Sequence, residues 1–221
     1  MRATDLLKNA AQSDWDAATD HPFCKDLAAG TLPLDKMRQY LVQDYKFVDG
    51  FVRLLATAIA HAPSLADGVP MAQFLGLVTS TENTYFLRSF EALNVSDVDQ
   101  GVPATPATQA FQGLMHGARM SGRYEQMLAV LDVAEVSYLT WADRYKTYDP
   151  DLPFWFSEWI DLHTGDGFES IVNHLRRQLD AVWDALDDHQ KATVTEMFCD
   201  AVRYERAFFD AAYAERPIEQ A

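Results

Sequence analysis

The sequence is poor in cysteine and in basic residues, and each shortage excludes a class of protein. Cys24 and Cys199 are the two cysteines among 221 residues. Neither a CxxC motif nor a paired Cys/His spacing is present, so the pattern provides no disulfide framework and no zinc motif. The 33 acidic residues outnumber the 18 basic ones, and the formal charge is −15 at pH 7. This balance argues against binding to nucleic acid, because proteins that bind it usually present a basic face.

Long apolar runs are also absent. No uninterrupted apolar segment is long enough to cross a bilayer, and residues 1–10 contain no apolar signal core. Two unpaired cysteines suit a reducing compartment. We therefore expect a cytoplasmic protein with no membrane partner, and its hydrophobic content of 48% is sufficient for a full core.

Proline falls between segments of helical periodicity or close to their ends. Apolar residues recur at three- and four-residue spacing nearly everywhere, and no segment alternates as a half-buried strand would. The longest connection is 94–107, which contains several turn-forming residues and is the best loop candidate. Helices are expected at about residues 4–19, 22–30, 33–61, 69–92, 107–120, 123–147, 153–164, 167–186 and 188–214. The sequence therefore predicts an all-α fold of about seven to eight main helices, in a single domain spanning residues 1–221.

Three carboxylates stand inside apolar helical segments, where the burial of a charge is costly. They are Asp44, Glu135 and Glu205, each close to aromatic residues. Because they are far apart in the sequence, we interpret them as one polar point inside a helical bundle. Aromatic walls with a few convergent acids suit a flat, nitrogen-rich, partly cationic ligand.

Asp44 also has a purely structural interpretation. It shares one helix face with Phe47 and Phe51. The alternatives to a functional role are a surface pair with Lys46 or Arg53, or a buried hydrogen bond to a neighbouring helix.

Glu135 interrupts an apolar stripe formed by Leu128, Leu131 and Tyr138. Asp132 falls on the same side of this helix, so the pattern allows a carboxylate pair. The alternative for Glu135 is an ordinary acid at the helix surface.

Glu205 precedes Phe208 and Phe209 by three and four residues. Its structural alternative is an i,i+4 ion pair with a basic neighbour. Taken together, the three acids favour a functional site, because acids in one dry region shift each other's pKa values and so supply an acid and a base.

Several short segments keep a characteristic order and spacing from Trp15 to the C-terminal region. The segments are His21-Pro22-Phe23, Thr31-Leu32-Pro33, Tyr40–Asp44, Phe154–Ile160, Phe168–Val172, Leu179-Asp180 and Tyr204–Phe209. Together they resemble the TenA / thiaminase II family over almost the whole chain. The resemblance implies a haem-oxygenase-like helical bundle that forms a homo-oligomer, either a dimer or a tetramer. No metal and no cofactor are expected.

The chain departs from the better-known branch of that family, which uses a cysteine nucleophile in the fifth main helix. Residues 128–144 contain no cysteine, and Glu135 falls at or near the corresponding position. Phe111 and His163 stand where the family pattern has tyrosines. The chain is therefore similar to the cysteine-lacking branch, in which a glutamate takes that place in the site. Cys24 and Cys199 are interpreted as packing thiols, so no covalent thiol step is expected.

The resemblance also implies roles for the candidate residues. Asp44 is expected to hold the exocyclic amine or a ring nitrogen of an aminopyrimidine, and Phe47 to pack on the ring. Glu205 is expected to act as acid and base at the departing group, with Glu135 orienting or deprotonating a water. The remaining residues expected in the substrate site are Tyr138, His163 and Phe111.

The implied reaction is a thiamin-salvage hydrolysis. An aminomethyl- or formylaminomethyl-pyrimidine from thiamin breakdown is converted to 4-amino-5-hydroxymethyl-2-methylpyrimidine. One alternative is a pyrimidine-binding protein without activity. A metal oxidase on the same bundle is a weaker alternative, since Ser89 follows Glu82 by seven residues where such proteins tend to have histidine. A transcriptional regulator that binds DNA is disfavoured by the charge, and a cofactor-independent oxidase would need a basic pocket.

Overall fold

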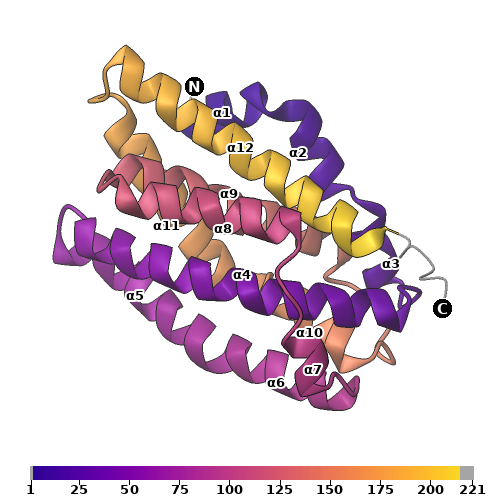
Figure 1. The fold of residues 1–221 in the computed structure, drawn as a ribbon. Helices are drawn as coiled ribbons and strands as arrows, with labels where there is room; N and C mark the ends of the chain where they lie inside the picture. Colours follow the sequence, from indigo (N-terminus) through magenta and orange to yellow (C-terminus); the bar gives the residue numbers. More distant parts are fainter. Residues whose placement is uncertain (1, 215–221) are drawn as a thin grey trace.

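The computed structural model describes residues 2–214, and every element in this range is helical (Figure 1). Residue 1 and residues 215–221, the two ends of the expected domain, lie outside the described range. The elements are α1 (Ala3–Ala10), α2 (Gln12–Thr19), α3 (Pro22–Ala28), α4 (Leu34–His61), α5 (Leu65–Leu77), the π-helical turn η1 (Val78–Glu82), α6 (Asn83–Ala92), α7 (Asp97–Gln100), α8 (Pro106–Met120), α9 (Tyr124–Tyr145), α10 (Phe154–Leu162), α11 (Gly165–Trp183) and α12 (Asp188–Tyr213). The prediction of an all-α fold is confirmed.

Two expected helices are divided in the structure. The segment 4–19 breaks at Ala11 into α1 and α2. The segment 69–92 begins earlier, because the Ser64 hydroxyl accepts a hydrogen bond from the Asp67 backbone N–H and caps α5. The same segment contains η1, which widens the helix by one residue before α6 begins. The expected loop at 94–107 contains the short helix α7, which begins with a capping box.

Helix α9 forms the centre of the bundle. It packs against α4, α8, α10, α11 and α12, and its residues 127–135 are all buried. A helix that is apolar around its whole circumference is stable only when other helices surround it. Figure 1 shows α12 and α4 running along the length of the molecule with α8 between them. One continuous apolar core extends from Leu7 in α1 to Ala212 in α12.

The connection between α6 and α8 is fixed to α4 by one side chain. The Gln43 amide donates to the backbone oxygen of Pro103 (3.2 Å) and accepts from the Thr105 backbone N–H (2.8 Å) and the Thr108 hydroxyl (2.8 Å). Gln43 is itself buried. Buried amides of this kind need all their partners, so the connection has one defined position against α4.

Asp132 is a buried acid that does not belong with Glu135. It is 2% exposed, and its Oδ1 has no hydrogen-bond partner among residues 2–214. Its charged neighbours are Arg176, Asp180 and Arg2, from α11 and the start of the chain. The carboxylate pair that helical spacing allowed is therefore not formed. Burial raises the pKa of Asp132 to about 7.

Asp132→Asn is expected to stabilise the protein at pH 8 by about 2–4 kcal/mol, and by less at pH 5. The pKa of Asp132 rises from 3.8 to about 7 on folding, so the folded state binds more protons than the unfolded state between these values. The stability of the wild type consequently falls as the pH rises through this window, whereas asparagine does not titrate. Urea unfolding at both pH values measures the difference.

The control for this comparison is Asp35→Asn, which changes an exposed acid at the start of α4. It is expected to change the free energy of unfolding by no more than about 0.5 kcal/mol at either pH. A stabilisation by Asp132→Asn of equal size at pH 5 and pH 8 would contradict the assigned titration.

Candidate active site

Side chains from several helices line one small cavity. Asp44 and Phe47 line it from α4, Glu82 from η1 and Glu135 from α9. The other lining residues are Val48, Phe51, Phe74, Ala134, Tyr138, Trp159 and His163. We call this space the inner cavity. Its volume is about 30 Å³, enough for one or two water molecules, so a larger ligand requires the lining side chains to move apart.

Asp44 is directed into the protein and not toward the surface. It is 3% exposed, and its Oδ2 has no hydrogen-bond partner among residues 2–214. The two basic residues considered as surface partners are bound elsewhere. Lys46 donates to the backbone oxygen of Gln100 (2.8 Å), and Arg53 pairs with Asp49 (3.0 Å). A buried carboxyl oxygen without a partner is costly, and a polar ligand would supply the missing donor.

Glu205 lies on α12, next to the residues that line the inner cavity. It is 2% exposed, and its Oε1 also lacks a hydrogen-bond partner within the described chain. The neighbouring Arg206 pairs with Asp14 (3.0 Å) and does not neutralise it. Burial raises the pKa of Glu205, and the charges of Asp44 and Glu135 raise it further. The structure therefore brings the three acids identified in the sequence into one electrostatic group.

Glu82 is the fourth member of this acidic group. Desolvation raises its pKa to about 8, and its charge adds to the burial that raises the pKa values of Asp44 and Glu135. None of the four acids has a Lys, Arg or His ion-pair partner within residues 2–214. Four carboxyl groups that repel each other in a dry region titrate as a coupled set and do not all ionise together near pH 7. The group can therefore both donate and accept protons.

The position of Glu82 was missed by sequence reasoning, which considered this residue only as a metal ligand. It is the last residue of η1, and the wide turn directs it toward the inner cavity. The hydroxyls of Thr79 and Ser80 donate to the backbone oxygens of Leu75 (2.8 Å) and Gly76 (2.6 Å). Hydroxyl residues compete for backbone groups in this way, and π-bulges occur frequently at functional sites. The run Thr79-Ser80-Thr81 was the available signal.

A short hydrogen-bond chain joins the aromatic residues of the site. The hydroxyls of Tyr40 and Tyr138 are 2.7 Å apart, and Trp159 Nε1 donates to the Tyr40 hydroxyl (3.2 Å). His163 Nδ1 donates to the backbone oxygen of Trp159 (2.8 Å), and burial lowers the pKa of His163 to about 4. His163 is therefore neutral near pH 7, with Nε2 as its acceptor. Trp159 lines the inner cavity, and its hydrogen bond connects Tyr40 to that lining.

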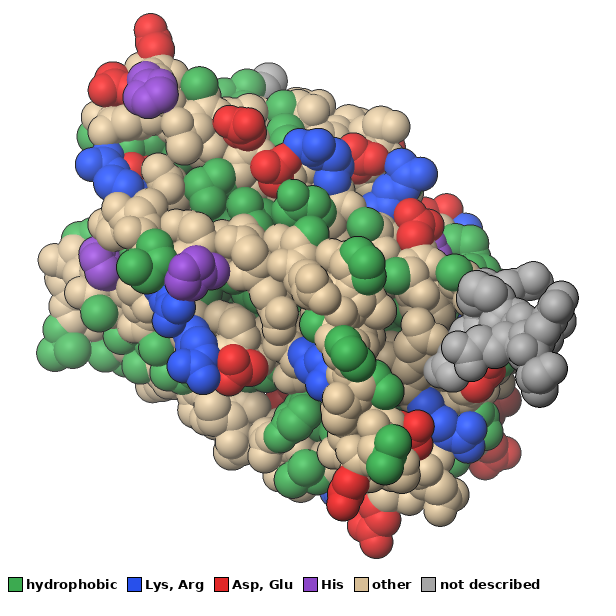
Figure 2. Space-filling model, viewed as in Figure 1, with side chains coloured by type: hydrophobic (Ala, Val, Ile, Leu, Met, Phe, Trp, Pro, Cys, Tyr) green, Lys and Arg blue, Asp and Glu red, His purple; other side chains and the backbone are tan. Residues whose placement is uncertain are grey.

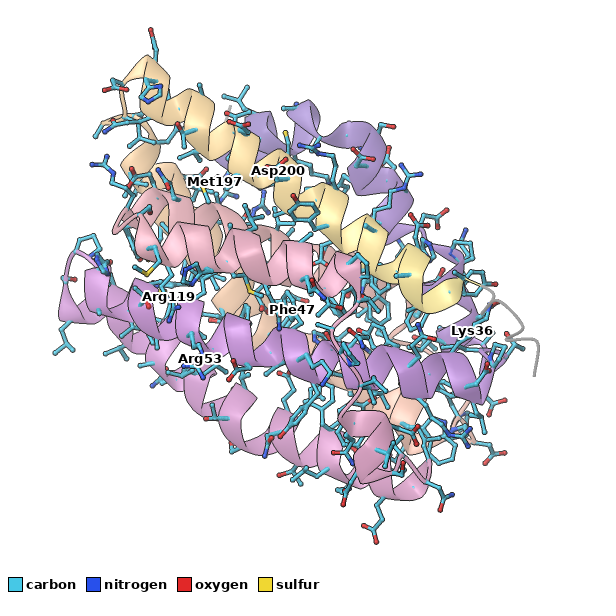
Figure 3. All side chains as sticks on the ribbon, viewed as in Figure 1. Lys36, Phe47, Arg53, Arg119, Met197 and Asp200 are labelled. Carbon is cyan, nitrogen blue, oxygen red and sulfur yellow. The ribbon has the colours of Figure 1, made fainter. Side chains whose placement is uncertain are left out.

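Phe47 and Phe111 occupy different positions relative to the inner cavity. Phe47 lines it from α4 and lies between α4 and α8 (Figure 3). Phe111, on α8, packs against Phe47 with ring centroids 4.9 Å apart, and it is absent from the cavity lining. Phe111 thus supports the position of Phe47, and direct contact between Phe111 and a substrate stays a prediction.

The two cysteines differ in their distance from the site. Cys24 on α3 is buried, and the charge of Glu205 adds to the burial that raises the pKa of its thiol. Cys199 is half-buried on α12, and its charged neighbours Arg203 and Asp200 lie outside the cavity lining. The thiolate is the reactive form of cysteine. A thiol held protonated beside a carboxyl group agrees with the packing role expected for Cys24.

Comparison with known proteins agrees with this architecture. The model of the TENA/THI-4/PQQC family matches residues 8–215. The chain belongs to this family. Curated relatives named aminopyrimidine aminohydrolase occur in Bacillus subtilis (24% identity, covering 96% of this chain and 90% of the relative) and in Helicobacter pylori (24% identity, covering 96% and 99%).

Solved structures show the same fold. A TenA homologue from P. horikoshii superposes with a TM-score of 0.82 at 22% identity, covering 96% of this chain and 99% of that one. Heme oxygenase-1 from the cyanobacterium Synechocystis superposes with a TM-score of 0.64 at 14% identity, covering 96% and 92%. The expected haem-oxygenase-like bundle is therefore confirmed.

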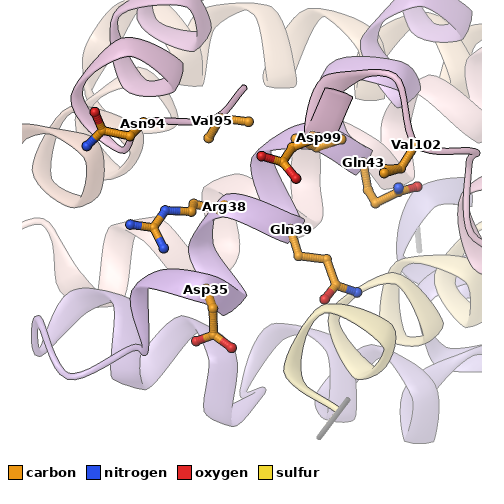
Figure 4. A pocket seen from close by; sticks show the side chains of 9 residues that line it. Asp35, Arg38, Gln39, Gln43, Asn94, Val95, Asp99 and Val102 are labelled. Carbon is orange, nitrogen blue, oxygen red and sulfur yellow. The ribbon is translucent and has the colours of Figure 1, made fainter. Parts of the chain in front are cut away.

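Larger pockets lie outside the inner cavity of this TenA-family chain, and one of about 240 Å³ between α4 and α8 shares none of its lining residues. A groove of about 290 Å³ lies between α4 and the connection around α7, and its lining includes Asp35, Arg38 and Asn94 (Figure 4). A second pocket of about 250 Å³ lies at the turn between α10 and α11. The second shares Glu82 and Phe74 with the inner cavity, whereas the groove shares none of its lining residues. Proximity to the acids therefore favours the pocket at the α10–α11 turn as part of the site.

Figure 2 shows acidic and basic side chains interspersed over the visible face, without a continuous basic surface there. Within residues 2–214, no three His, Cys, Asp or Glu side chains are grouped closely enough to share a metal ion. None of the helices in that range is sufficiently long and apolar to span a membrane.

Proposed function

We propose that this protein is a thiamin-salvage hydrolase. It releases 4-amino-5-hydroxymethyl-2-methylpyrimidine from aminomethyl- or formylaminomethyl-pyrimidines, without a cysteine nucleophile. The observation that carries the proposal is the group of buried acids without cationic partners: Asp44 and Glu135 line one cavity, and Glu205 is coupled to both. Full-length relatives named aminopyrimidine aminohydrolase support the substrate class.

Asp44 is the proposed anchor for the pyrimidine. A 4-aminopyrimidine presents an amine donor beside a ring-nitrogen acceptor, and a carboxylic acid presents the complementary pair. Burial and the charge of Glu82 raise the pKa of Asp44, which favours the neutral form that both donates and accepts. Phe47 provides an apolar wall for the face of the ring.

Glu205 and Glu135 are the proposed acid and base. The raised pKa of Glu205 keeps a proton available near pH 7 for a departing nitrogen that is neutral in the bound substrate. Glu135 accepts a proton from water, whose oxygen forms a bond to the exocyclic carbon as the carbon–nitrogen bond breaks. The electron pair of that bond leaves with the nitrogen, which departs as an amine or amide. Each positioned acid or base typically contributes a factor of ~10²–10⁴.

Turnover of purified protein with thiamin, the aminomethyl-pyrimidine and the formylaminomethyl-pyrimidine tests the proposal. The hydroxymethyl product is followed by chromatography, with no metal added. Product is expected from the last two compounds and little from thiamin, because the chain lacks a thiolate at Glu135. Efficient cleavage of thiamin would contradict the assigned branch. Binding of all three compounds without product would show a pyrimidine-binding protein instead.

A further inference from the structure

The pocket at the α10–α11 turn is the only one of the larger pockets described above that adjoins the inner cavity. We call it the outer pocket. Its volume is about 250 Å³, close to the lower end of the range for small-molecule sites. Its lining residues are Phe74, Leu77, Thr81, Glu82, Asp161, Leu162, Thr164, Gly165, Asp166, Gly167 and Phe168. It is therefore large enough for a small substituent that extends beyond the inner cavity.

The boundary between the two spaces consists of one acid and an aromatic cluster. Glu82 and Phe74 line both spaces. Phe74 and Phe168 meet edge to face with centroids 6.1 Å apart, and Phe168 meets His163 of the inner cavity at 5.2 Å. Phenyl rings at a boundary can rotate without breaking hydrogen bonds. A ligand that spans the boundary would thus contact Glu82 and displace the rings.

The charge of the outer pocket favours a cation. Its titratable lining residues are Glu82, Asp161 and Asp166, and no Lys, Arg or His lines it. Asp161 already accepts a hydrogen bond from the Tyr148 hydroxyl (2.7 Å). The carboxyl group of Glu82 has no hydrogen-bond or ion-pair partner among residues 2–214, and the residue is half-buried. In the inner cavity, Oδ2 of buried Asp44 has no hydrogen-bond partner, so it can bind a second polar group of the same ligand.

We propose that the outer pocket receives the substituent on the exocyclic nitrogen of the substrate, and that Glu82 selects a protonated amine there over a neutral acyl amide. This inference rests on the proposed function. When Asp44 holds the pyrimidine in the inner cavity, the group beyond the scissile bond needs adjoining space, and the outer pocket provides it. A primary amine can take the proton of the Glu82 carboxyl group and form an ammonium–carboxylate pair with a charge-assisted hydrogen bond, whereas a formamide is too weak a base to take that proton.

The test is Glu82→Gln, assayed with the aminomethyl-pyrimidine and the formylaminomethyl-pyrimidine on one preparation. The kcat/KM ratio of the first substrate to the second is expected to fall about tenfold. Because both rates come from the same sample, the ratio does not depend on the fraction of folded protein. The matched control is Glu196→Gln on the exposed surface of α12, which is expected to leave the ratio unchanged.

A second variant tests the space itself. A Cβ added at Gly167 meets no atom within 4 Å, so Gly167→Leu fits and places bulk at the wall of the outer pocket. It is expected to lower kcat/KM for the larger formylaminomethyl substrate about fivefold more than for the amine. Gly113→Leu, at another helical glycine with open space and outside all the pockets described, is the control. The two variants should therefore shift the ratio in opposite directions.

The outcomes separate this inference from the proposed function. If the wild type turns over both substrates and Glu82→Gln leaves the ratio unchanged, or lowers both rates equally, the role of Glu82 is wrong. If the wild type turns over neither, the proposed function is wrong. In that case the role of Glu82 is tested by the ratio of the dissociation constants of the two compounds. Calorimetry measures this ratio for the wild type and for each variant. Binding of neither compound overturns both proposals.

Discussion

Replacement of Glu205 by glutamine is expected to lower kcat for the formylaminomethyl-pyrimidine, whose neutral amide nitrogen must gain a proton as it departs, by ~10²–10⁴-fold, with little change in KM. Glutamine has nearly the shape of glutamate but cannot transfer a proton to the departing nitrogen. The change is expected in kcat because the proton is transferred in the transition state, whereas KM mainly reflects interactions made when the substrate binds. Steady-state kinetics near pH 7 measures it.

The unfolding temperature of Glu205→Gln shows whether a lower rate comes from the missing proton donor or from partial unfolding of the variant. Burial raises the pKa of Glu205 well above 4.5, so the folded state retains a proton that the unfolded state releases. The contribution of Glu205 to the stability of the wild type is therefore lost as the pH rises above about 4.5, and glutamine at this position removes that part of the pH dependence. The variant is expected to unfold at or above the wild-type temperature at pH 8. An active variant, retaining most of the wild-type rate, would contradict the catalytic role.

Asp44→Ala is expected to weaken binding of 4-amino-5-hydroxymethyl-2-methylpyrimidine by about 100-fold. Alanine removes both hydrogen bonds to the ring, each worth roughly 1–2 kcal/mol when the alternative is an unsatisfied buried group. Isothermal titration calorimetry measures the dissociation constant directly. Binding of the product is the informative assay, because it does not involve Glu205 as a proton donor.

A comparison with Asp44→Asn reports the protonation state of the anchor. Asparagine offers one acceptor and one donor, as a neutral carboxylic acid does. Since the pKa of Asp44 is raised by burial, asparagine is expected to recover most of the affinity that alanine loses. Asp35→Ala, an exposed change on the same helix, is the control. Affinity in Asp44→Ala equal to that of the wild type would remove Asp44 from the binding site.

Helix positions were largely predictable, because they depend on local spacing and on Gly and Pro at the boundaries. The long helices α4 and α12 lie within one or two residues of their expected limits. The break at Ala11 and the π-helical turn η1 were not predicted. Both depend on how neighbouring helices pack, and a 3.6-residue periodicity contains no information about a single inserted residue.

The acids on apolar helix faces were identified correctly as buried, but the pair that the pattern allowed between Asp132 and Glu135 is not formed. Asp132 and Glu135 are three residues apart on α9, and helical spacing placed them on one side. In the structure α9 is surrounded on all sides, so Asp132 faces α11 and the N-terminal residues, whereas Glu135 faces the inner cavity. Reasoning from an amphipathic pattern assumes that a helix has one buried and one exposed face, whereas a central helix is buried on every face.

The sequence by itself determined that this is a helical protein with buried acids at Asp44, Glu135 and Glu205, because the cost of burying a charge makes such positions conspicuous in apolar segments. Only the tertiary structure decided which acids lie together, that Glu82 joins them, and that an outer pocket adjoins the inner cavity. These features depend on contacts between elements distant in the sequence. Their positions are set by packing of the whole core, which no local pattern specifies.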